Sequence, residues 1–251
     1  MGRIIMDKIA IIIPSRLSAE RLPNKPLELI NGKEMILHVY EAAKKANVAE
    51  VYVASPDETI VELIKKNNGN AIKTNKEHHT GTDRIFEVFD KYLNKSPKII
   101  VNLQGDMPNI NPNVIKLLIK HMEENICEIG TLAGNLKNNS EILDQNIVKV
   151  ALNSKPKINQ FVEAYDFKRK IDKEEIDLYF HHVGIYGFTS EALLRYVSLK
   201  RSKLEMERKL EQLRALENKM RIDVGLIDSC PLSVDTKEDL TFIKKIMEKN
   251  E

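Results

Sequence analysis

The stretch that decides the fold is the apolar run Ile9-Ala10-Ile11-Ile12-Ile13-Pro14. A run of β-branched residues with almost no polar interruption is typical of a strand that helices cover on both faces, as in the middle of a parallel sheet. The segment 15–26 follows directly, and Pro23 and Pro26 within it prevent a continuous helix. The sequence therefore predicts a buried central strand that runs into a shaped loop.

This loop carries three cations, Arg16, Arg21 and Lys25. Ligands of open α/β sheets bind at the carboxyl ends of the strands, so a cationic loop at such an end predicts a polyphosphate site. A solvated basic turn would show the same residues. The loop alone leaves both interpretations open.

The composition is that of an ordinary globular protein. Hydrophobic residues make up 42% of the 251 residues and charged residues 30%, so the chain can bury a core. The 39 Lys and Arg residues nearly balance the 37 Asp and Glu residues, which leaves a net charge of +2. This balance argues against a nucleic-acid or membrane partner, and any anion binding must be local.

The cysteines and the amino terminus indicate the compartment. Cys127 and Cys230 stand far apart without a CxxC partner, which argues against a disulfide framework or a zinc site and favours two buried apolar residues. The amino terminus lacks the apolar stretch of a signal peptide, and no run is long enough to span a membrane. We expect a reduced, soluble, cytoplasmic protein.

The first half of the chain alternates strands with amphipathic helices, and Asn31-Gly32 marks a tight turn. The expected strands are 9–14, 50–55, 70–74 and 98–103, and the expected helices are 33–47, 57–67 and one that is capped by Thr82 or Asp83. This order predicts a right-handed doubly wound α/β unit.

The second half is less regular, and the charged segment 153–177 shows little periodicity. The expected strands are 129–133, 148–152, 181–188 and 221–227, and the expected helices are 113–124, 190–199, 201–218 and 236–249. We interpret residues 1–251 as a single α/β domain with a region inserted at about 125–190.

Two further patterns suggest metal ligands. Asp106 follows Gly105 at the carboxyl end of a buried strand, which suits a hard divalent ion that enters with phosphate oxygens, although a turn before a helix would look the same. His78 and His79 are adjacent, and neighbouring side chains point in different directions on most backbones. We therefore favour surface histidines over a metal site there.

Six segments, taken in their order along the chain, carry a more specific signal. They are Ile12-Ile13-Pro14-Ser15-Arg16 continued by 21–26, Gly81-Thr82-Asp83-Arg84, Val101-Asn102-Leu103-Gln104-Gly105-Asp106, His182-Val183-Gly184-Ile185-Tyr186-Gly187, Leu210-Glu211-Gln212-Leu213-Arg214, and Val234-Asp235-Thr236-Lys237-Glu238-Asp239-Leu240. Each is weak alone, but the ordered set resembles the 3-deoxy-manno-octulosonate cytidylyltransferases, also called CMP-KDO synthetases.

The resemblance implies a transfer of CMP from CTP to the anomeric hydroxyl of a 2-keto-3-deoxy sugar acid, with release of pyrophosphate and use of Mg²⁺. Such a transfer needs positioning and cations more than a protein nucleophile. The resemblance also implies a mixed, mostly parallel, doubly wound sheet of the nucleotidyltransferase (Rossmann-like) type with a smaller inserted dimerisation and sugar-binding region. A homodimer and a role in bacterial lipopolysaccharide synthesis are implied as well.

The matching positions carry expected roles. Arg16 and Lys25 match the triphosphate-binding loop of the family, with Ser15 and Arg21 alongside. The family also places two metal-binding aspartates at strand ends. Their counterparts here, which would hold one or two Mg²⁺ ions, are Asp106 and Asp235.

Five more positions match residues near the nucleotide and the sugar. Gln104 and Arg84 would contribute orienting hydrogen bonds, and His182, Glu211 and Gln212 match residues that contact the sugar acid. Without the resemblance, His182 would be a strand-end histidine satisfied by backbone. Glu211 and Gln212 would ordinarily form the solvent face of a helix.

Two departures from the family concern the acceptor. The family usually carries Tyr-Phe-Ser-Arg-x-x-Ile-Pro before the histidine strand, whereas segment 159–167 has neither Ser-Arg nor Ile-Pro. The acceptor-facing arginine is therefore missing or supplied from elsewhere, with Arg169 as a candidate. Met107 also stands where an acidic residue is often found. A modified octulosonate, a sialate-type acid or a non-catalytic CTP-binding protein are the alternatives that these departures leave open.

Overall fold

The computed structural model describes residues 8–18 and 21–248. Predictions made for the first seven residues and for positions 19 and 20 lie outside these described residues. The chain divides into two compact units, which we call unit 1 (up to Lys116, and again from Pro231) and unit 2 (Leu117–Cys230). The region expected as an insertion at about 125–190 falls inside unit 2. Within the described ranges, no helix combines the length and apolar character needed to cross a membrane.

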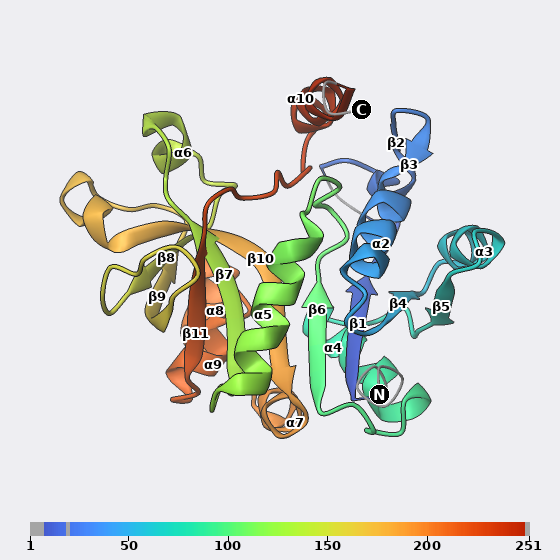
Figure 1. The fold of residues 1–251 in the computed structure, drawn as a ribbon, viewed down its shortest axis with the longest axis horizontal. Coiled ribbons are helices and arrows are strands. Elements are labelled where there is room, and N and C mark those ends of the chain that lie inside the picture. Colours follow the sequence, from blue (N-terminus) through green and yellow to red (C-terminus); the bar gives the residue numbers. More distant parts are fainter. Residues whose placement is uncertain (1–7, 19–20, 249–251) are drawn as a thin grey trace. The chain divides into compact units, whose positions relative to one another are not determined.

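Unit 1 is built on a parallel sheet with the strand order β5-β4-β1-β6 (Figure 1). The strands are β1 (Ile9–Pro14), β4 (Glu50–Ser55), β5 (Asn70–Lys73) and β6 (Ile99–Leu103). Ile9 to Ile13 are buried, as the apolar run predicted, and β1 lies between two neighbours. The carboxyl end of β1 therefore delivers the basic loop to the same edge as the end of β6.

The helices of unit 1 follow the amphipathic segments closely. They are the 3₁₀-helix η1 (Lys25–Leu27), α2 (Met35–Ala46), α3 (Glu58–Lys66), α4 (Gly81–Glu87) continued by the π-helix η2 (Val88–Tyr92), and α10 (Lys237–Glu248). The expected turn at Asn31-Gly32 joins β2 (Leu29–Ile30) to β3 (Lys33–Glu34), with both turn residues in the left-handed region. Helix α5 (Pro112–Glu124) begins in unit 1 and ends in unit 2.

The predicted start of α4 was wrong. Its N-cap is Thr80, whose hydroxyl accepts from the backbone N–H of Asp83 at 3.1 Å, while the Asp83 carboxylate accepts from the Thr80 N–H at 3.1 Å. This capping box leaves Gly81 as the first helical residue. Thr82 is buried and accepts a hydrogen bond from the side chain of Asn102.

Unit 2 contains a more mixed sheet, whose pairings β10-β7-β11-β9-β8 close on themselves because β8 also pairs with β10. The strands are β7 (Ile129–Gly134), β8 (Lys149–Leu152), β9 (Phe161–Lys168), β10 (Tyr179–Thr189) and β11 (Ile222–Ile227). Four of these pairings are antiparallel and only β11 with β7 is parallel. The expectation of a mostly parallel sheet therefore holds for unit 1 and fails for unit 2.

The helices of unit 2 show the largest difference from expectation. They are α6 (Asn139–Leu143), the 3₁₀-helix η3 (Lys173–Leu178), α7 (Ser190–Ser198), α8 (Lys203–Arg208) and α9 (Leu213–Glu217). The single helix predicted over 201–218 is two short helices, because α8 ends at Arg208 and is followed by Lys209, whose φ of 55° is left-handed. The strand β9 lies in the segment for which no element was predicted.

Candidate active site

The basic loop of unit 1 is held at the strand ends by backbone contacts. The N–H of Ser15 donates to the carbonyl of Ala54 at 2.9 Å, and the N–H of Leu17 donates to Asp57 Oδ2 at 2.8 Å. Asn24 takes a left-handed conformation (φ 58°) between the turn and η1, which an asparagine tolerates better than most residues. These contacts fix the conformation of the loop and therefore the position of Lys25.

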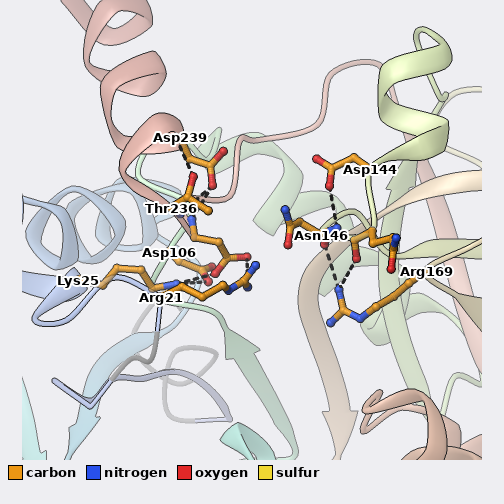
Figure 2. Close-up of polar contacts among 10 residues, drawn as sticks. Arg21, Lys25, Asp106, Asp144, Asn146, Arg169, Thr236 and Asp239 are labelled. Atoms are coloured by element: carbon orange, nitrogen blue, oxygen red, sulfur yellow. Dashed lines mark hydrogen bonds and ion pairs between the residues drawn. The ribbon is translucent and has the colours of Figure 1, made fainter.

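Lys25 joins the two aspartates that were predicted as metal ligands. Its Nζ lies 3.0 Å from Asp106 Oδ2 and 3.1 Å from Asp235 Oδ1. The guanidinium of Arg21 contacts the other Asp235 oxygen at 3.1 Å, and Figure 2 shows both cations reaching toward these carboxylates. Two segments more than 100 residues apart thus meet around a single ammonium group.

The first turn of α10 fixes the position of Asp235. The Asp239 carboxylate accepts from the backbone N–H groups of Asp235 (3.0 Å) and Thr236 (2.9 Å), and the Thr236 hydroxyl accepts from the Asp239 N–H (Figure 2). The N–H of Val234 donates to the carbonyl of Asp106 at 2.9 Å. Val234 also belongs to a buried cluster with residues of the loop, β2, α2 and α10: Leu22, Ile30, Met35, Leu240 and Ile243. The segment from Val234 into α10 therefore forms part of this site.

The charge state of Lys25 follows from these contacts. Burial lowers the pKa of Lys25, but attraction to and hydrogen bonds with Asp106 and Asp235 outweigh it, so the pKa is raised above its usual 10.5. The ammonium remains protonated throughout the physiological range. It balances one of the two carboxylate charges, with Arg21 adjacent.

A pocket of about 640 Å³ opens beside this cluster. Its lining includes Ser15, Arg16, Arg84 and Gln104 together with the charged group described above, which consists of Arg21, Lys25, Asp106 and Asp235. Arg16 is exposed, whereas Ser15 is buried and its Oγ has no hydrogen-bond partner among the described residues. A buried hydroxyl without a partner at the mouth of a cationic loop is suited to an anionic ligand oxygen.

Arg84 is less available than the sequence suggested. Its guanidinium donates to Thr74 Oγ1 (2.6 Å), Asn75 O (2.9 Å) and Lys76 O (3.4 Å), and the residue is buried. Burial and the neighbouring Arg16 lower the pKa of Arg84. Arg84 therefore holds the wall of the pocket and adds positive charge to it.

Gln104 and the adjacent histidines also line the pocket. Gln104 Nε2 donates to Asn102 Oδ1 at 3.2 Å, which fixes its amide. His78 was expected at the surface, but it is largely buried and its Nε2 lies 2.7 Å from Glu87 Oε2. That pairing anchors the loop before α4, whereas His79 is exposed.

In unit 2, His182 lies in β10 and is buried. The hydroxyl of Thr131 donates its one proton to the carbonyl of Ile185 at 2.6 Å, so the 3.1 Å contact between Thr131 Oγ1 and His182 Nε2 is one in which the imidazole donates. This assigns the Nε2–H tautomer and leaves Nδ1 as the acceptor. Burial, with a smaller contribution from His181, lowers the pKa of His182 to about 3. The imidazole is therefore neutral at physiological pH.

Tyr186 is a candidate that sequence reasoning missed. Its ring lies 5.2 Å from that of His182, and its buried hydroxyl has no hydrogen-bond partner in the part of the chain that the structure describes. Burial, together with the charge of Glu211, raises the pKa of Tyr186 well above 10.0. The sequence carried a signal, since Tyr186 lies within the His182–Gly187 motif, but nothing in the motif indicated an unpaired hydroxyl.

Glu211 and Gln212 lie in the break between α8 and α9. Gln212 is buried and Glu211 is half-buried, so neither lies on the solvent face of a long helix. The interaction of Glu211 with Tyr186 places it on the same side of unit 2 as His182. The structure thus brings His182, Tyr186 and Glu211 near one another, and Gln212 follows Glu211 in the chain.

The departures from the family pattern also have structural counterparts. Arg169 Nη1 donates to the carbonyls of Gln145 (2.9 Å) and Asn146 (3.2 Å), which ties it to the loop before β8. Figure 2 shows the contact with Asn146. Beside β9, a different arginine is present: Arg208 NH1 lies 2.6 Å from Asp166 Oδ1. Met107 is buried.

Neither cysteine belongs to the groups of side chains described above. Cys127 is buried next to Asp223, and burial raises the pKa of its thiol to about 12. The carboxylate of Asp223 accepts from Arg221 Nε (2.7 Å) on one oxygen and contacts His121 Nε2 (3.0 Å) with the other. His121, Cys127 and Asp223 therefore form a hydrogen-bonded network with Arg221. Burial likewise raises the pKa of Cys230 to about 12.

The comparisons with known proteins agree on one family. The family model described as Cytidylyltransferase matches residues 10–222. The chain is 40% identical over 238 residues to the 3-deoxy-manno-octulosonate cytidylyltransferase of Bartonella henselae, covering 94% of this chain and 97% of that protein. It is 38% identical over 241 residues to the enzyme of the same name from Rhodopseudomonas palustris, covering 96% and 98%.

Solved structures extend this similarity to the fold. A CMP:2-keto-3-deoxy-manno-octonic acid synthetase complexed with CTP matches with a TM-score of 0.87 and 34% identity over 97% of this chain and 100% of that one. An apo UDP-glucose pyrophosphorylase matches with a TM-score of 0.70 at 13% identity, over 96% and 98% of the two chains. The latter shows a shared nucleotidyltransferase fold alone.

Proposed function

Because the chain belongs to the 3-deoxy-manno-octulosonate cytidylyltransferases, we propose that it transfers CMP from CTP to 3-deoxy-manno-octulosonate or a close variant and releases pyrophosphate. The observation that carries this proposal is the convergence of Lys25, Asp106 and Asp235 beside a pocket with a cationic wall. The relative solved with CTP supports the choice of nucleotide.

The triphosphate would bind to the basic loop of unit 1. Arg16 and Lys25 supply positive charge for the β- and γ-phosphates, and Arg21 stands beside Lys25. The unpartnered hydroxyl of Ser15 is available to donate to a phosphate oxygen. These groups balance the charge of the leaving pyrophosphate, which is how a protein without a nucleophile accelerates this transfer.

The donor set of the site fits magnesium. Asp106 and Asp235 offer carboxylate oxygens around one point that already holds a cationic group, and oxygen donors are the ligands that Mg²⁺ prefers. We therefore propose these two residues as its ligands, with Lys25 free to turn toward phosphate when the ion binds. Bound Mg²⁺ would lower the pKa of the attacking hydroxyl and screen the phosphate charge.

The sugar acid would be bound by residues of unit 2. His182 is neutral, with Nδ1 as an acceptor for a sugar hydroxyl, and the hydroxyl of Tyr186 lacks an internal partner. Glu211 and Gln212 add acceptor and amide groups from the break between α8 and α9. This set suits a polyhydroxylated ligand. We extend the proposal to a homodimer in the cytoplasm that supplies lipopolysaccharide synthesis, as the resemblance implied.

A pyrophosphate-release assay tests the proposal. Purified protein with CTP, Mg²⁺ and octulosonate should release pyrophosphate, and replacing CTP by ATP, GTP or UTP should reduce the rate strongly. Activity with a sialate-type acid but not with octulosonate would contradict the acceptor assignment. Binding of CTP without turnover of any sugar acid would contradict catalysis and indicate a nucleotide-binding relative.

A further inference from the structure

The break between α8 and α9 is supported by a buried ion pair. Glu205 and Arg214 have side chains that are 1% and 3% exposed, and the guanidinium of Arg214 donates to both Glu205 oxygens at 2.7 and 2.8 Å. The same carboxylate caps α8, since it accepts from the N–H of Ser202 at 3.1 Å. Arg201 Nε adds a third donor at 3.0 Å. One buried carboxylate thus connects the start of α8 to α9.

A second support comes from α7. The ring of Tyr196 lies under the guanidinium of Arg214 at 4.6 Å, and the Tyr196 hydroxyl donates to the backbone carbonyl of Glu211 at 2.8 Å. The same carbonyl accepts from the N–H of Arg214 at 3.1 Å. The backbone of Glu211 is therefore held from α7 and α9 together, although the residue lies in a break between helices.

These contacts are more than a short turn needs. Breaks between helices are usually exposed and tolerate change, because their backbone groups can bind water. Here a fully charged pair is buried, which costs desolvation energy and requires its hydrogen bonds to be satisfied. The residues so held, Glu211 and Gln212, are those proposed to contact the sugar acid.

We propose that Tyr196, Glu205 and Arg214 are positioning residues for the acceptor, acting through the backbone at Glu211 and Gln212; this rests on the function proposed above. None of the three needs to touch the substrate. Precise placement of the acceptor affects its binding and the rate of transfer, whereas the nucleotide-binding residues of unit 1 are unaffected.

The sharpest test is Tyr196→Phe, which keeps the ring under Arg214 and removes only the hydroxyl. The matched control is Ser198→Ala on the same helix, whose hydroxyl donates to the α7 carbonyl of Arg195 instead. We expect Tyr196→Phe to raise the KM for the sugar acid about threefold to tenfold, with the Kd of CTP unchanged. Ser198→Ala should leave both constants unchanged.

Two further variants separate positioning from general loosening. Glu205→Gln should raise the KM for the sugar acid further, with folding checked by thermal melting. In a Glu211→Ala background, Tyr196→Phe should raise that KM by a smaller factor than it does in the parent, because the two residues act as one unit.

The outcomes distinguish a failure of the proposed function from a failure of the positioning role alone. If the parent protein releases no pyrophosphate with any sugar acid, the proposed function falls and the positioning role falls with it. If the parent is active but Tyr196→Phe matches Ser198→Ala, or raises the CTP and sugar-acid constants equally, the positioning role alone is overturned.

Discussion

The buried histidine of β10 makes the stability of the protein depend on pH. Burial, with some contribution from His181, lowers the pKa of His182 to about 3, whereas an exposed histidine titrates near 6.5. Below the unfolded value, the unfolded chain binds a proton that the folded chain does not. The stabilising contribution is therefore complete above about pH 6.5 and is lost as the pH falls toward 3.

The magnitude follows from the pKa difference. Each unit of pH between the two values costs about 1.4 kcal/mol, so moving from about pH 8 to about pH 5 removes about 2 kcal/mol of unfolding free energy through this one residue. The variant His182→Gln has no group to titrate at this position. The loss of stability on acidification should therefore be smaller in the variant by about 2 kcal/mol.

Urea unfolding followed by circular dichroism at the two pH values measures this difference. The control is Ser198→Ala, which removes no titratable group and should lose as much stability on acidification as the parent. Equal losses in the parent and in His182→Gln, within about 0.5 kcal/mol, would refute the reasoning, because they would mean that His182 titrates alike in both states.

Three further predictions concern the two units separately. Asp106→Asn should lower kcat/KM in the pyrophosphate assay on the order of 10²-fold with little change in melting temperature, and near-normal turnover would exclude the metal role. Lys25→Met should weaken CTP binding in calorimetry at least about tenfold, since it removes a phosphate-binding cation, and an unchanged Kd would contradict that role. Thr131→Val should cost about 1–3 kcal/mol in urea unfolding, because it leaves the Ile185 carbonyl and the His182 ring nitrogen without their partner, and a neutral result would contradict a stabilising role for these two hydrogen bonds.

The parts of the fold that were predicted correctly are those in which local and tertiary forces agree. The strands β1, β4 and β6 are rich in apolar residues and are largely or fully buried, so period and composition identify them without ambiguity. The position of Asp106 after β6 followed from the same reasoning. That Asp235 meets it could not follow from local pattern, since the contact depends on where α10 docks in unit 1.

The errors have identifiable physical causes. The helix expected over 201–218 has good helix formers throughout. Lys209, however, adopts a left-handed conformation that a lysine rarely takes and that the sequence therefore does not predict. The buried pair of Glu205 with Arg214 explains why that conformation persists, because tertiary contacts outweigh propensity. The strand β9 was missed because three of its eight residues are charged and only two of its positions are buried.

The start of α4 illustrates a signal that was present but misassigned. Thr80 and Asp83 have the spacing of a capping box, and the choice of Thr82 or Asp83 as the cap used residue type without that spacing. The shift matters for the site, since Gly81 is then the first helical residue. A Cβ there would lie 3.3 Å from both Gln104 Nε2 and Pro14 Cγ, so a side chain would crowd the pocket wall.

The charges of unit 2 bear on segment 159–167, for which the resemblance implied an arginine. A neutral His182 can offer a sugar acid a hydrogen bond but no positive charge. Arg214 is committed to Glu205, and Arg169 is held by two carbonyls of the loop before β8. Arg208 stands at the end of α8, three residues before Glu211, and is held as well, because it pairs with Asp166 on β9 and also donates to the Phe167 carbonyl at 3.0 Å. The cation beside β9 therefore comes from α8 and not from segment 159–167 itself. All three arginines thus already have partners within unit 2, so a carboxylate could bind one of them only by displacing such a partner.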